Sequence, residues 1–174
     1  GLGDVYKRQV ERSQYVKLIT WIVSFIILMA GIVFPVLILW VNQDMMSKVI
    51  GASVLCLIFF TLIFTVAYQP RKLILSETHI IMERILGQVY ISYSDITDIS
   101  LYHRENVAEI RIFGIGGLGG YIGKFYNSKI GFYTAYVGDY SQAFLIKINN
   151  REKYVMSCRH AEKIVEEVKS RLKQ

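Results

Sequence analysis

Two long apolar runs without a charged residue constrain this chain more than any other feature. They cover residues 18–41 and 49–68. A bilayer core of ~30 Å is crossed by about 20 helical residues rising ~1.5 Å each, so both runs are long enough to span a membrane. Backbone polar groups in lipid must be satisfied within the segment, which predicts two transmembrane helices, with a kink in the first at Pro35.

The connection between the runs is short. Residues 42–48 form a predicted external loop of seven residues, which allows only a tight antiparallel hairpin. Trp21, Trp40 and Tyr68 lie near the ends of the runs, as aromatic residues do at membrane interfaces. The first run is too long for a cleaved signal peptide, and a second run follows it at once.

Basic residues flanking the hairpin predict its orientation. Arg12 and Lys17 precede the first run, and Arg71 and Lys72 follow the second, whereas the connecting loop contains only Lys48. Under the positive-inside rule both termini are expected in the cytoplasm. The predicted location is the cytoplasmic membrane, with a cytoplasmic tail over residues 1–17 and a cytoplasmic domain over residues 70–174.

Neither run contains an Asp, Glu, Lys, Arg or His side chain. Ion pathways and proton relays normally need acidic, basic or histidine side chains inside the membrane. Ser24, Thr61 and Thr65 are the polar residues considered, and we expect their hydroxyl groups to bond within the helices. The hairpin is therefore interpreted as an anchor.

The segment after residue 69 has the mixed polarity of a soluble domain. It holds 15 basic and 11 acidic residues, a net charge of +4. That charge is compatible with attraction to an anionic leaflet. No block of Lys and Arg is interleaved with aromatic residues, so nucleic acid is not an expected partner. Cys56 and Cys158 cannot form a disulfide framework and are interpreted as structural thiols in a reducing compartment.

Residues 1–9 (GLGDVYKRQ) do not begin with Met. They resemble translated sequencing-adapter fragments, and we leave them out of the fold prediction.

Short alternating or apolar runs predict a strand-rich domain closed by one helix. Ala161, Ile164, Val165, Val168 and Leu172 recur at three- and four-residue steps and predict an amphipathic C-terminal helix, whose apolar stripe must be buried against the sheet. The expected strands cover residues 72–75, 79–85, 88–93, 96–101, 109–113, 130–137, 143–148 and 153–157.

This plan resembles the bacterial pleckstrin-homology-like (PH-like) domains that follow two transmembrane helices. The resemblance is carried by residues 90–96 (YISYSDI), 114–125 (GIGGLGGYIGKF), 132–136 (FYTAY) and 153–157 (KYVMS). It implies a membrane α-hairpin followed by a mostly-β, α+β domain. That domain would be an antiparallel curved sheet or barrel of seven to eight strands, capped by the C-terminal amphipathic helix. The family supplies no site residue or general enzymatic activity to carry over.

The glycine-rich segment 114–125 admits several interpretations. It contains GxGxxG, with Asp139 20 residues beyond the last glycine, but the following residues are typical of a strand, whereas a dinucleotide site needs a helix. A Walker A loop also fails, because Leu118 and Phe125 occupy required positions. We expect the glycines to allow positive φ, bulges and close backbone approach where a long strand bends. The alternative is a functional loop that contacts a partner or lipid headgroups.

Candidate contact residues follow from that alternative. They are Tyr121, Lys124, Phe125, Tyr126 and Lys129. The neighbouring Tyr133, Tyr136 and Tyr140 are expected to be sheet-facing aromatics or an interface patch. Lys124 and Lys129, with Lys147, Arg151 and Lys153, would either form a phosphate-attracting rim or a solvated surface.

No metal, cofactor or catalytic motif is recognised. His79, His103 and His160 are far apart in the sequence, and neither HExxH nor GxSxG occurs. The expected function is a membrane-anchored, non-enzymatic binding or scaffolding module whose partner is a protein or an anionic lipid. Two alternatives are an accessory subunit assembled through the hairpin and an enzyme with an unrecognised site.

Overall fold

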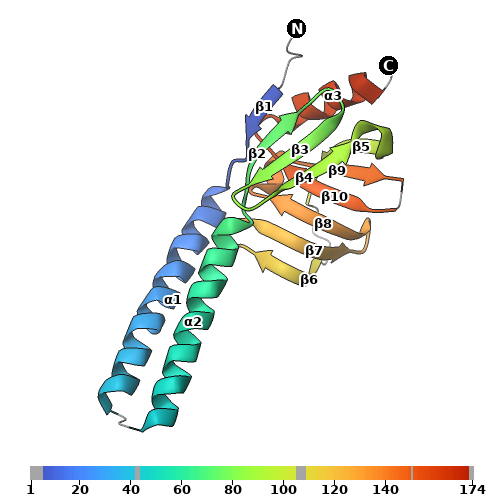
Figure 1. Ribbon diagram of the computed structural model, residues 1–174. Helices are drawn as coiled ribbons and strands as arrows, with labels where there is room; N and C mark the ends of the chain where they lie inside the picture. Colours follow the sequence, from blue (N-terminus) through green and yellow to red (C-terminus); the bar gives the residue numbers. More distant parts are fainter. Residues whose placement is uncertain (1–5, 42–43, 105–108, 150, 173–174) are drawn as a thin grey trace.

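The computed structural model describes residues 6–41, 44–104, 109–149 and 151–172. A long helical hairpin extends from one end of a domain made of two sheets and one helix (Figure 1). The predicted class, two apolar helices followed by a strand-rich domain with a C-terminal helix, is confirmed.

The hairpin consists of α1 (Gln14–Val41) and α2 (Met45–Ala67). Stretches of 25 and 23 residues in these helices are long and apolar enough to cross a membrane. The second helix begins earlier than the apolar run because Asp44 caps it, accepting a hydrogen bond from the Ser47 amide at 3.0 Å. Residues 42 and 43 of the predicted loop lie outside the described residues.

Small and polar residues in the hairpin serve its internal packing. Gly31 lies against Ile58, and Gly51 lies against Ile38, so the two helices approach closely at these points. The Thr61 hydroxyl donates to the Ile58 carbonyl at 2.8 Å, and the other predicted threonine likewise bonds within its helix. The prediction of intrahelical bonding is confirmed for both threonines.

The smaller sheet, sheet A, has four strands in the order β1-β2-β3-β4. All its neighbours are antiparallel. The first strand belongs to the segment that we left out of the fold prediction, and it pairs with the strand that directly follows the hairpin. The bounds are β1 (Tyr6–Gln9), β2 (Pro70–Leu75), β3 (His79–Arg84) and β4 (Gln88–Ser92).

The larger sheet, sheet B, has six strands in the order β5-β9-β10-β8-β7-β6. The neighbours β10 and β8 run parallel, and all other pairs are antiparallel. The bounds are β5 (Ile96–Tyr102), β6 (Glu109–Gly116), β7 (Tyr121–Asn127), β8 (Gly131–Val137), β9 (Ala143–Ile148) and β10 (Lys153–Ser157).

The C-terminal helix α3 (Ala161–Leu172) covers the main core. Its predicted apolar stripe is buried, with Ile164 and Val168 fully inaccessible to solvent. They pack with residues of both sheets, among them Leu73, Met82 and Phe144. The helix is thus the cap that the sequence pattern predicts.

Three details differ from the expected sheet. The region of residues 70–174 contains nine described strands, because residues 121–137 form two strands joined by a turn. The sheets are not closed into one barrel. The parallel pair arises because β10 lies between β9 and β8, so the chain crosses over β10 on its way from β8 to β9.

Candidate interaction site

The glycine-rich segment forms the facing parts of β6 and β7 and the turn between them. Gly114 and Gly123 lie opposite each other and have φ angles of +119° and +126°. A Cβ atom on Gly114 would lie 2.1 Å from the carbonyl oxygen of Ile122, and one on Gly123 would lie 2.2 Å from that of Phe113. Only glycine tolerates both conditions. The prediction of positive φ and close backbone approach is confirmed, although the segment is a hairpin and not one bent strand.

The hairpin geometry of this segment excludes a dinucleotide-binding site. The turn is followed by β7, whereas a dinucleotide-binding glycine turn opens a helix within a βαβ unit. Asp139, which has the sequence spacing of a ribose-binding carboxylate, instead accepts a hydrogen bond from the Ser141 amide at 2.9 Å and caps a short 3₁₀ helix.

The β6–β7 turn docks onto the end of the helical hairpin. The Gly117 amide donates to the Gly120 carbonyl at 2.9 Å and closes the turn. The Gly119 amide donates to the Thr20 hydroxyl of α1 at 2.7 Å. Gln69, which is buried directly after α2, lies beside Gly119 and accepts a hydrogen bond from Arg12 at 2.5 Å. The glycine segment therefore connects the larger sheet to both helices at the domain end of the hairpin, and we call this contact region the first joint.

A second joint connects the hairpin to the smaller sheet. The Leu86 amide, in the turn between β3 and β4, donates to the Ala67 carbonyl at the end of α2 at 2.8 Å. The Arg84 guanidinium lies 5.1 Å from the Tyr68 ring centroid and 5.6 Å from that of Tyr136. Because Tyr136 is on β8, Arg84 joins α2, sheet A and sheet B through cation–π contacts.

Removing the Thr20 hydroxyl tests the first joint. Thr20→Val keeps the side-chain shape but leaves the buried Gly119 amide without its acceptor, a loss we expect to cost about 1–3 kcal/mol. Amide exchange at Gly119 in the full-length protein should become faster. Thr61→Val is the matched control, because the Thr61 hydroxyl bonds only within α2. Unchanged exchange in Thr20→Val would contradict the docking of this turn.

The five predicted contact residues do not share one surface. Lys124 and Tyr126 lie on one face of β7, and Tyr121 and Phe125 lie on the other. Phe125 is 2% exposed and packs in a second core cluster, so its side chain is not available for an outside contact. Lys124 and Lys129 are exposed, and Tyr126 is half-buried against Phe132.

A tyrosine-rich cluster lies on the face of sheet B that carries Phe125. The Tyr133 and Tyr140 hydroxyl groups lie 3.3 Å apart, and Tyr140 donates to the buried Glu109 carboxylate at 3.3 Å. Arg104 pairs with Glu109 at 3.3 Å and lies 4.7 Å from the Tyr140 ring centroid. Burial raises the pKa of Tyr133 and Tyr140, so both hydroxyl groups stay protonated and act as neutral donors. The expected sheet-facing role holds for these tyrosines.

Four of the five basic residues predicted to form a rim lie at the turns β7–β8 and β9–β10. Lys147 and Lys153 are opposite each other in the sheet, and Lys153 donates to the Ile130 carbonyl. Lys147 also pairs with Asp98 at 2.8 Å. Lys124 is separate, in the middle of β7. The ammonium groups of Lys147 and Lys153 therefore already make contacts within the domain.

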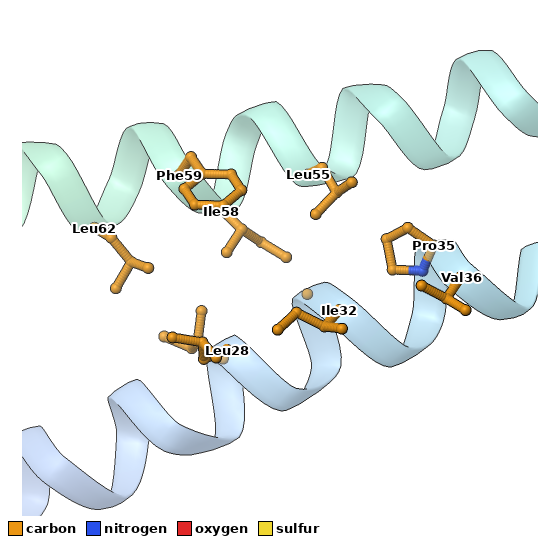
Figure 2. Close-up of a pocket in the computed structure, with 10 residues that line it drawn as sticks. Leu28, Ile32, Pro35, Val36, Leu55, Ile58, Phe59 and Leu62 are labelled. Atoms are coloured by element: carbon orange, nitrogen blue, oxygen red, sulfur yellow. The ribbon is translucent and has the colours of Figure 1, made fainter. Parts of the chain in front are cut away.

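A groove of about 380 Å³ lies between the two helices of the hairpin. Figure 2 shows side chains from both helices pointing into it, with Pro35 at one end. It offers only dispersion contacts to an occupant, because no lining side chain carries a polar group. The lining residues are Ile27, Leu28, Gly31, Ile32, Pro35, Val36, Leu55, Ile58, Phe59 and Leu62.

Within the described parts of the chain, no group of three or more His, Cys, Asp or Glu side chains could hold a metal ion. The two joints and the groove were missed by sequence reasoning. Thr20 and Gly119 are 99 residues apart, and no local pattern links them. The groove depends on the relative rotation of two helices that are apolar on all sides.

Fold and site together define a class: a domain of two sheets and a capping helix, attached to an apolar helical hairpin. The family model described as Bacterial PH domain matches residues 71–172. The chain belongs to this family. A comparison with curated proteins found no match, and neither did a comparison with solved structures. PH domains are generally non-catalytic binding modules, which agrees with the interpretation of this domain as a binding or scaffolding module.

Proposed function

We propose that this protein is a membrane-anchored, non-enzymatic PH-like module that binds a protein partner or an anionic lipid on the cytoplasmic side. The observation that carries the proposal is the pair of joints between the domain and the hairpin. The Gly119 amide bonds to Thr20 on α1, and the Leu86 amide bonds to the Ala67 carbonyl on α2. A binding domain fixed in this way would present its surfaces at a set position relative to the bilayer.

Anchorage is supported by the outward surface of the hairpin. Large apolar side chains such as Phe25 and Phe60 are mostly exposed along both helices. Exposed apolar surface of this extent is unfavourable in water, and lipid is the solvent that accepts it. Proposed spans are residues 18–41 and 49–68, joined by an external loop at 42–48.

The proposed orientation places the tail of residues 1–17 and the domain of residues 70–174 in the cytoplasm. Its support is the concentration of Arg12, Lys17, Arg71 and Lys72 at one end of the hairpin, with Lys48 at the other. A net charge of +4 on residues 70–174 favours partners or headgroups that are acidic.

The partner can be sought by comparing two tagged proteins in living cells. One is the full-length chain, and the other is the hairpin alone, residues 10–69. After crosslinking, a protein captured only with the full-length chain would support a protein-binding domain. Capture of no protein with either would favour lipid, and the full-length protein in liposomes should then bind short-chain anionic lipid more weakly as salt is raised. Salt-independent behaviour together with no captured protein would contradict the proposal.

A second candidate function is an accessory subunit of a larger membrane complex. The apolar groove between α1 and α2 favours it, because a helix of another subunit could fill that space. Capture of the same membrane protein by the full-length chain and by the hairpin alone would support this candidate. Loss of that capture when the exposed lining residue Ile32 is replaced by alanine would place the contact in the groove.

A further inference from the structure

The outer strand of sheet B exposes apolar side chains without a described covering element. Among the described strands, β6 lies at the edge of sheet B and pairs with β7 alone. Its Phe113 is 72% exposed, and Ile110 and Ile112 are exposed as well. An edge strand in water is normally protected by charges, bulges or a covering segment, because its apolar side chains and free backbone groups favour aggregation. This strand has one bulge and one basic residue, Arg111, among these apolar positions.

The position of β6 relative to the hairpin is fixed. The strand ends at Gly116, and the next residues form the turn that bonds to Thr20 near the start of α1. In Figure 1, β6 is the lowest strand of sheet B, on the side of the domain toward which the hairpin extends, and it runs sideways from the helices. A membrane that accommodates the hairpin would therefore have its surface close to this strand.

A second exposed apolar element lies at the same end of the hairpin. Ile85 and Leu86, in the turn between β3 and β4, are 52% and 57% exposed. The Leu86 amide is bonded to the Ala67 carbonyl, in the last turn of α2. Two separate parts of the domain thus place apolar side chains beside the two helix ends that face the domain.

We propose that β6 and the β3–β4 turn lie on the bilayer, with Ile85, Leu86, Ile110, Ile112 and Phe113 in the boundary between headgroups and acyl chains. These five residues are called the bilayer-facing surface. The inference rests on the proposed membrane anchorage. A bilayer is favoured as the occupant because the surface continues from the apolar hairpin, and because the exposed Lys124, which lies opposite Phe113 in the sheet, complements anionic headgroups.

The depth of single spin labels in the full-length protein in liposomes tests the inference. The background is Cys56→Ala, and Cys158 stays unlabelled because burial raises the pKa of its thiol to about 12. Labels are placed through Phe113→Cys and Ile110→Cys on β6. Leu57→Cys in α2 serves as the reference in the hairpin. Glu166→Cys on the exposed side of α3 serves as the aqueous reference. Each label is exposed to oxygen, which concentrates in lipid, and to a water-soluble nickel complex.

Labels on β6 are expected to favour oxygen and to lie about 5–10 Å below the headgroups, as interfacial segments do. Labels at 113 and 110 that behave like the label at 166, while the label at 57 stays in lipid, would overturn the bilayer-facing surface and leave the anchorage intact. A label at 57 that is accessible to nickel would instead overturn the anchorage. Spin–spin broadening at 113 that disappears on dilution with unlabelled protein would show a second copy on β6 and would also overturn the inference.

Discussion

Replacing Gly114 by valine is expected to destabilise the domain by about 2–5 kcal/mol, because the side chain would meet the opposing strand and force an unfavourable φ. The new Cβ would lie 2.1 Å from the Ile122 carbonyl oxygen, and the φ angle there is +119°. Since backbone atoms block the side chain, rotation of a neighbour cannot relieve the clash. Denaturant unfolding of the full-length protein, followed by aromatic circular dichroism, measures the loss.

Gly116→Ala is the matched control for this prediction. Gly116 is in the same strand, but an added Cβ would meet only side-chain atoms at 3.4 Å or more, and its φ lies outside the left-handed region. Its effect should stay within about 0.5 kcal/mol. Equal losses in the two variants would show that the cost comes from general glycine replacement and not from the close approach of β6 and β7.

Replacing Phe144 by alanine is expected to cost about 3–5 kcal/mol, because it removes a large side chain from the main core and leaves a cavity. Phe144 is 0% exposed and packs among residues of both sheets and α3. Phe132→Ala provides the comparison, since Phe132 is 68% exposed on the neighbouring part of sheet B. Equilibrium unfolding should separate the two phenylalanines clearly, and similar losses would contradict the assignment of the core.

The helices and the cap were predictable because their signals are local. Long uncharged runs predict spanning helices, and the stripe containing Ile164 and Val168 predicts a buried helix face. The bounds shifted for local reasons as well: α2 starts at Met45 because Asp44 caps it. A search for a capping residue before the second run would have found this start.

The arrangement of the sheets was less predictable. Both faces of β7 carry aromatic residues, so alternation alone does not show that Phe125 is buried while Tyr126 is half-buried. A bulge between Arg111 and Phe113 also changes which side chains of β6 share a face. The pairing of β10 with β8 depends on how the chain crosses from β8 to β9, and no local sequence pattern records this crossing.

The first strand precedes the hairpin, and its partner follows it. β1 pairs with β2, and the Ser13 amide donates to the Gly138 carbonyl at 3.2 Å, so the domain takes in chain from both sides of the hairpin. In a membrane, a chain that inserted only one of its two helices would leave these partners in different compartments. Under the proposed anchorage, the domain would therefore be completed only in a chain whose two helices had both inserted, and a fully folded domain would report a correctly threaded hairpin.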